Sequence, residues 1–294
     1  MGEFHGYLLI YNNLIFLLMR TKISILAAII AIFTMISFAP KNIRWVAIGD
    51  SITYLNEHPD ETQNRITKGY MTLVVEKLPN ISYVNQGHNG WTSGGIAQKI
   101  EKLGLIPADV YSVFLGTNDW WQGRPVGALS DYQNNTGNNT LYGSFRIIIE
   151  KLRSLNKNAR IILITPMQRV DFVYINDMKN NAWGSYKEKN GQSLGAFANA
   201  ISEIGRFEKF EVVDLYHSPA LKIEELVKYK RLKDPQTGEY KNFPYPHFID
   251  VPFHPETDEY PYPAESIDLT YDGLHPSDKG YRIIADMLAE ILKK

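Results

Sequence analysis

The chain has 294 residues, of which 44% are hydrophobic and 21% are charged, and this balance is typical of a globular protein with a sizeable core. Its formal net charge of -1 excludes the strong basic field that favours nucleic acid as a partner. The sequence has no cysteine, which excludes disulfides, cysteine-ligated zinc and thiol catalysis.

Two apolar stretches, Tyr7 to Leu18 and Ile23 to Phe38, precede the first predicted strand, with Arg and Lys between them. A basic segment, an apolar segment and small residues on both sides of Phe38 are typical of a secretory signal. Because Pro40 is a poor context for cleavage, an uncleaved anchor is the alternative. We therefore expect residues 1–39 to be a signal peptide or an N-terminal anchor. The protein would then be periplasmic, at the cell surface or secreted, and membrane association would involve this segment alone.

The first strand of the domain is predicted from Trp45 to Ile48, a short apolar run that Gly49 ends. Ser51 follows directly. Residues just past the carboxyl end of a parallel strand stand where open α/β sheets bind their ligands. Gly-Asp-Ser is also common in turns, so Ser51 is either a turn residue or a nucleophile. Motifs later in the sequence distinguish the two interpretations.

Helical and strand patterns then alternate along the chain, which predicts a five-stranded parallel sheet covered by helices on both faces. The predicted strands after the first are 81–84, 110–115, 160–165 and 210–215, and the predicted helices are 69–78, 96–103, 145–155, 194–204 and 278–292. Residues 56–68, 122–140 and 171–191 are predicted to be loops.

Residues 216–270 break this alternation. We expect a basic helical piece at 223–233, followed by a run crowded with proline and aromatic residues, which blocks continuous helix and central strand. A disordered linker would be poor in aromatics, so we interpret this segment as an ordered lid inserted in a single domain, residues 40–294.

Five residues in four separate loops meet the chemical needs of ester hydrolysis. Ser51 is a weak nucleophile that needs a base, and a histidine with a pKa near 6.5 can take and return its proton. His275 has Asp272 three residues before it, close enough in a tight turn to hold one tautomer. The backbone N–H groups of Ser51 and Gly90 and the amide of Asn118 are candidate donors for an oxyanion hole.

This set resembles the SGNH hydrolases, also called GDSL esterases, through four blocks in the family's order. The blocks are Gly49-Asp50-Ser51; Asn85, Gly90 and Thr92; Gly116-Thr117-Asn118-Asp119; and Asp272-Gly273-Leu274-His275-Pro276. The resemblance implies a flavodoxin-like α/β/α sandwich and ester hydrolysis without metal or organic cofactor. It implies that Ser51 is the nucleophile, His275 the base and Asp272 its orienting partner, with Gly90 and Asn118 in the oxyanion hole. The segment 216–270 exceeds the minimal family pattern.

Several side chains next to these blocks are candidate substrate contacts. Trp91, Trp120 and Trp121 directly follow site residues, and one of them would stack on a sugar face, although tryptophan is more often a packing residue. His88 lies in the same loop as Gly90. No pair of histidines has metal-ligand spacing, so no metal site is predicted. Asp119 is expected to brace its loop.

Three functions fit the sequence. The first is an exported serine esterase that removes small acyl groups, acetyl foremost, from carbohydrate or small-molecule esters. The second is a lipase or thioesterase acting on longer acyl chains, which needs an apolar channel near Ser51. The third is a non-catalytic carbohydrate-binding protein on a hydrolase fold, against which an intact triad argues. The sequence leaves the oligomeric state open.

Overall fold

The computed structural model describes residues 16–25 and 41–294. The chain divides into two compact units, residues 1–42 and 43–294, which are considered separately. In the first unit, residues 16–25 are helical, and most of the predicted signal or anchor (1–39) lies outside the described residues. No helix among the described residues is both long enough and apolar enough to cross a membrane.

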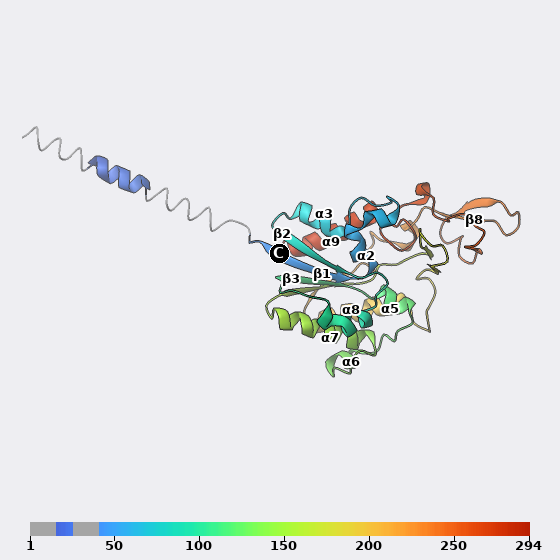
Figure 1. Cartoon of the computed structure of the whole chain (residues 1–294), viewed down its shortest axis with the longest axis horizontal. Coiled ribbons are helices and arrows are strands. Elements are labelled where there is room, and N and C mark those ends of the chain that lie inside the picture. Colours follow the sequence, from blue (N-terminus) through green and yellow to red (C-terminus); the bar gives the residue numbers. More distant parts are fainter. Residues whose placement is uncertain (1–15, 26–40) are drawn as a thin grey trace, which may run out of the picture. The chain divides into compact units, whose positions relative to one another are not determined.

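The second unit is built on a five-stranded parallel sheet with the strand order β2-β1-β3-β4-β7, which is the flavodoxin-like order (Figure 1). The strands are β1 (Ile43–Gly49), β2 (Ile81–Gly87), β3 (Val110–Phe114), β4 (Arg160–Ile164) and β7 (Glu211–Val213). Gly49 pairs with Gly87 of β2 on one side and with Phe114 of β3 on the other, so these three strands end at the same level. The loops that follow them therefore meet at one edge of the sheet.

The side chains of the central strands alternate between two cores. Trp45 and Ala47 of β1 enter one cluster, whereas Val46 and Ile48 enter the other, and all four are buried. This is why the run is apolar throughout instead of alternating with polar residues. Figure 1 shows α3 (Tyr70–Lys77) and α9 (Asp278–Leu292) on one face, and α7 (Leu141–Leu155) and α8 (Leu194–Glu208) on the other.

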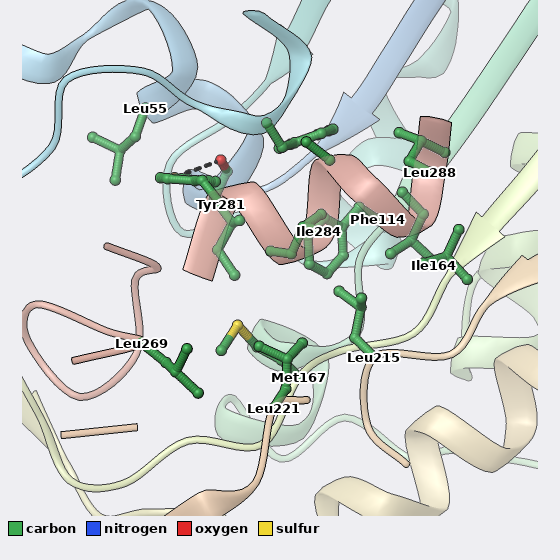
Figure 2. Close-up of a cluster of buried hydrophobic side chains, with 14 of the residues drawn as sticks. Leu55, Phe114, Ile164, Met167, Leu215, Leu221, Leu269, Tyr281, Ile284 and Leu288 are labelled. Carbon is green, nitrogen blue, oxygen red and sulfur yellow. Dashed lines mark hydrogen bonds between the residues drawn. The ribbon is translucent and has the colours of Figure 1, made fainter. Parts of the chain in front are cut away.

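The last helix illustrates how the core forms. Ser277 caps the N-terminus of α9, and Tyr281, Ile284 and Leu288 recur at helical spacing on its buried side. Figure 2 shows these three side chains in one cluster with Phe114 of β3. Replacing a buried leucine such as Leu288 by alanine costs about 2 to 5 kcal/mol of stability.

The remaining elements are short. The helices are α2 (Ser51–Tyr54), α4 (Ser93–Lys99), α5 (Thr117–Trp121) and α6 (Leu129–Gln133). The 3-10 helices are η1 (Leu55–Glu57), η2 (Pro59–Thr62), η3 (Ile100–Lys102), η4 (Ile223–Glu225) and η5 (Ala264–Ser266). Two antiparallel hairpins complete the unit: β5 (Phe172–Val173) with β6 (Asn181–Ala182), and β8 (Lys230–Lys233) with β9 (Tyr240–Phe243).

The sequence prediction needs four corrections here. The predicted loop at 56–68 contains the 3-10 helix η2, and the predicted loop at 122–140 contains the helix α6. The expected basic helix at 223–233 is wrong, because the segment divides into η4 and the strand β8, which is stabilised by its pairing with β9. The predicted loop at 171–191 contains the hairpin β5–β6. The first strand, the last helix and the five-stranded parallel sheet agree with the prediction.

Candidate active site

Ser51 lies where β1 ends and α2 begins. The carboxylate of Asp50 caps this helix by accepting the backbone N–H of Ile52 at 3.0 Å. From α9, the hydroxyl of Tyr281 donates to the carbonyl of Ile52 at 2.9 Å. These two bonds fix the turn, so the hydroxyl of Ser51 stands on a rigid support at the edge of the sheet.

Asp272 and His275 form one tight turn, as their spacing predicts. With the imidazole proton on Nδ1, His275 donates to Oδ2 of Asp272 at 2.7 Å. The other carboxylate oxygen accepts the backbone N–H groups of Leu274 and His275, at 3.0 and 2.7 Å. Gly273 has a φ of +90°, and a Cβ there would lie 2.0 Å from the carbonyl oxygen of Asp171. Any side chain at position 273 would therefore displace either this turn or the segment beside it.

The two segments meet at the serine. Nε2 of His275 lies 2.8 Å from Oγ of Ser51, although the residues are 224 positions apart in the chain. Asp272 is fully buried and His275 is 5% exposed, so solvent does not compete for the bonds of this pair. The arrangement is a continuous hydrogen-bonded chain from hydroxyl to imidazole to carboxylate, and such a chain can activate a serine as nucleophile.

The predicted oxyanion donors come from the loops after β2 and β3. Asn118 Nδ2 donates to the carbonyl of Trp91 at 3.1 Å, which orients the amide and leaves its second hydrogen available. Gln122 donates to the carbonyl of Gly90 at 2.8 Å. Gly90 has a φ of +73°, a conformation that favours glycine, and it lines the same cavity as Ser51 and Asn118.

Asp119 is a bracing residue in the structure. Its carboxylate accepts both the backbone N–H and the hydroxyl of Ser93, at 2.8 and 2.6 Å, and an ion pair joins it to Arg124. These bonds tie the loop after β3 to the start of α4. Burial raises the pKa of Asp119, and the bonds from Ser93 oppose that shift. Burial also raises the pKa of Asp50, to about 6.

A cavity of about 520 Å³ opens beside Ser51 and His275. Its wall includes the predicted residues Gly90, Asn118 and Trp121. Sequence reasoning missed the remaining wall residues, which are Leu55, Glu61, Asn89, Gln122, Arg169, Phe172, Tyr174, Asn180, Tyr271 and Leu274. Three of them, Phe172, Tyr174 and Asn180, belong to residues 171–191, which are predicted to be a polar loop. The aromatic residues that closely follow Arg169 in the sequence are the signal that could have indicated this part of the wall.

The candidate substrate contacts separate into two groups. Trp121 lines the cavity, so its predicted contact with substrate remains a prediction. The same prediction for Trp120 is wrong, because this ring is fully buried and its Nε1 donates to the carbonyl of Gln192 at 2.9 Å. Trp91 and His88 stack on each other with ring centroids 4.5 Å apart, and neither lines the cavity.

The inserted segment 216–270 does not line this cavity, which corrects its interpretation as a lid. It packs behind the wall instead. Lys230 forms an ion pair of 2.8 Å with Asp171, and the hydroxyl of Tyr260 donates to the carbonyl of Val173 at 3.1 Å. The hydroxyl of Tyr262 donates to the carbonyl of Asp171. In the described part of the chain, no group of three or more histidine or acidic side chains could hold a metal ion.

Comparisons with known proteins agree with this architecture. The GDSL-like lipase/acylhydrolase family matches residues 47–283 of the chain. A solved structure described as a possible lipase from Chitinophaga pinensis is 66% identical, with a TM-score of 0.85 and coverage of 85% of this chain and 98% of that one. No curated protein matches the sequence.

Two more distant structures resemble the fold alone. A protein from Lactobacillus plantarum is 18% identical, with a TM-score of 0.56 and coverage of 87% of this chain and 98% of its own. An acetyl xylan esterase is 19% identical, with a TM-score of 0.51 and coverage of 85% of this chain and 100% of its own.

Proposed function

This chain belongs to the GDSL-like lipase/acylhydrolase family of ester hydrolases, and on that premise we propose that it is an exported serine esterase that removes small acyl groups, acetyl foremost, from carbohydrate. The observation that carries the catalytic part is the hydrogen-bonded chain from Ser51 through His275 to Asp272, with distances of 2.8 and 2.7 Å.

The proposed reaction follows from this geometry. Oγ of Ser51 attacks the ester carbonyl while Nε2 of His275 takes its proton, and Asp272 stabilises the imidazolium that forms. The N–H groups of Ser51 and Gly90 and the amide of Asn118 donate to the oxyanion. When the tetrahedral intermediate collapses, the alcohol leaves with the proton from His275. Water then attacks the acyl-serine with the same base, which releases the acid and restores Ser51.

The composition of the cavity supports a polar substrate. Asn89, Gln122 and Asn180 offer hydrogen bonds, while the ring of Trp121 supplies an apolar face of the kind that sugars stack on. A structural neighbour of the fold is named an acetyl xylan esterase, which agrees with this substrate class but does not identify it. Export is supported by the signal-like pattern of residues 1–39.

The second candidate is a lipase acting on longer acyl chains. It is favoured by the relative that is 66% identical and described as a possible lipase, and by the apolar side chains of Leu55, Phe172 and Leu274 in the wall. A cavity of about 520 Å³ has room for more than an acetyl group, so volume does not decide between the two candidates.

A panel of esters separates these candidates. Aryl esters from acetate to decanoate and a set of acetylated glycans are incubated with the purified protein, and the released acid is measured. The proposal expects kcat/KM to be highest for acetate and acetylated glycans to be deacetylated, whereas a maximum at octanoate or decanoate would establish the lipase. Mass spectrometry of the periplasmic, membrane and extracellular fractions of a bacterial host tests export, and recovery of the full chain in the cytoplasm alone would refute it.

A further inference from the structure

Arg169 is a buried cation in the wall of the cavity that contains Ser51. The residue is 1% exposed. Its Nη2 donates to the carbonyl of Trp183 at 2.9 Å, while its Nε is buried without a hydrogen-bond partner among the described residues. A guanidinium has five N–H donors, so this one keeps unused donors inside the protein.

Its charge also lacks a direct counter-ion. Among residues 16–25 and 41–294, no carboxylate oxygen forms an ion pair with this guanidinium within 4.0 Å. The two carboxylates that act on its charge are Asp171 and Asp272, and each already has a partner: Asp171 pairs with Lys230 and Asp272 with His275. Burial lowers the pKa of Arg169 and these two carboxylates oppose the shift, but a guanidinium starts from so high a value that it stays charged near neutral pH. A buried charge of this kind is costly unless something pairs with it.

A second cation adds to the same side of the cavity. The guanidinium of Arg169 lies 4.8 Å from the ring centroids of both Trp120 and Trp121. Nζ of Lys189 lies 4.4 Å from the Trp121 ring and 4.7 Å from the Trp183 ring, and in the described part of the chain it forms no ion pair. The ring of Trp121 therefore contacts both cations, and we call Arg169, Trp121 and Lys189 the cationic wall. The rings of Trp120 and Trp121 hold the guanidinium in place through cation–π contacts.

The cavity also contains a carboxylate. Glu61 comes from η2, and its Oε1 accepts the hydroxyl of Tyr54 at 2.7 Å. An anionic group is repelled by Glu61 and attracted by the cationic wall, so the two charges would orient an anionic substrate in a single direction.

We propose that Arg169 binds a carboxylate of the substrate, so that the preferred ester carries a free carboxylate besides its acyl ester group. This inference rests on the proposed ester hydrolysis at Ser51 and deepens it. Hydrogen bonds from a guanidinium to a carboxylate are strengthened by the opposite charges, and the substrate supplies the missing counter-charge. The carboxylate belongs either to the alcohol, as in an acetylated uronic acid, or to the acyl group, as in a hemisuccinate.

Matched pairs of substrates test this proposal with the wild-type protein. The first pair is an O-acetylated methyl glucuronoside and its uronamide, and the second is an aryl hemisuccinate and its methyl ester. We expect kcat/KM to be about 10- to 100-fold higher for the acid in one of the two pairs, which also identifies the side that carries the carboxylate. Equal rates in both pairs, or faster neutral esters, would overturn the inference while leaving ester hydrolysis intact. No hydrolysis of any ester would instead refute the proposed function.

Charge variants locate the effect. The measured quantity is the ratio of kcat/KM for the acid substrate to kcat/KM for its neutral partner. In Arg169→Met this ratio should fall to about 1, and in Lys189→Met it should fall a few-fold. Lys157→Met removes the same charge from an exposed position between α7 and β4, at the opposite edge of the sheet, and should keep the wild-type ratio. If Arg169→Met does not fold, the proposal is still tested by the ratio in the wild type and in Lys189→Met. A ratio that is unchanged in both wall variants, or reduced equally in Lys157→Met, would contradict the assignment to Arg169.

Discussion

Two regions build the cavity in different ways. The sheet-edge loops, which carry Ser51, Gly90 and Asn118, each follow directly from a strand of the parallel sheet. The segment 169–193, which carries Arg169 and Phe172, contains a hairpin of two strands with two residues each. It depends on side chains from the insertion 216–270 for support.

The two regions differ in the interactions that hold them in place. Backbone hydrogen bonds in register set the ends of β1, β2 and β3, so the sheet itself positions Ser51 and the proposed oxyanion donors. The wall is instead held by a few long-range contacts, above all the buried ion pair between Lys230 and Asp171. We infer that changes in the sheet-edge loops affect the chemical step, whereas changes behind the wall affect stability and substrate choice.

The largest effect is expected at the nucleophile. Ser51→Ala should lower kcat by roughly 10⁴- to 10⁶-fold, because the proposed covalent path is lost while the fold remains. Aryl acetate hydrolysis and fluorophosphonate labelling measure this. Ser154→Ala changes the same side chain at an exposed position near the end of α7 and should leave both readouts unaltered. Full activity in the Ser51 variant would refute the proposed mechanism.

The support of the wall gives the next largest effect. Lys230→Met removes the cation that pairs with the carboxylate of Asp171, at a site where the lysine side chain is 4% exposed. This should cost about 3 to 5 kcal/mol in the free energy of unfolding. Lys187→Met breaks a solvent-exposed pair with Asp250 and should cost less than about 1 kcal/mol. Urea unfolding compares the two, and equal costs would mean that the buried pair does not support the wall.

At the oxyanion site, Asn118→Ala should lower kcat by about 10²- to 10³-fold with little change in KM, because the donor acts on charge that develops in the transition state. Steady-state kinetics with an aryl acetate measures both parameters. Circular dichroism should match the wild type. A rise in KM without loss of kcat would assign Asn118 to substrate binding instead.

The smallest effect concerns pH and the turn that holds the nucleophile. Burial raises the pKa of Asp50 from 3.8 to about 6 in the folded protein, so between these values the folded state binds the proton more tightly than the unfolded state. The free energy of unfolding should therefore decrease as pH rises through this window, by about 1 to 3 kcal/mol.

Asp50→Asn removes this titration. Relative to the variant, the wild type should lose stability between pH 4 and pH 7, as urea unfolding at several pH values would measure. A difference between the two proteins that does not vary with pH would contradict the raised pKa. The shift would then have no role in the stability of the turn.

Much of the sheet-edge region was accessible from sequence, because its features are local. The apolar run 45–48 ending at Gly49 predicts a buried strand, and Asp272 and His275 are close enough in the chain to predict their turn. The wall was not accessible in this way. Nothing local distinguishes the buried Trp120 from the adjacent Trp121, which lines the cavity. Their difference follows from which neighbours pack on them.

The sequence by itself determined the alternation of strands and helices, the parallel sheet and the residues that follow its strands. These features depend on hydrophobic periodicity and on short-range turn chemistry. The tertiary structure decided the rest: the contact between Ser51 and His275, the conversion of residues 230–233 into a strand, and the burial of Arg169 beside two tryptophans. Each of these depends on partners far away in the chain, and the register and packing that bring such partners together are properties of the whole fold.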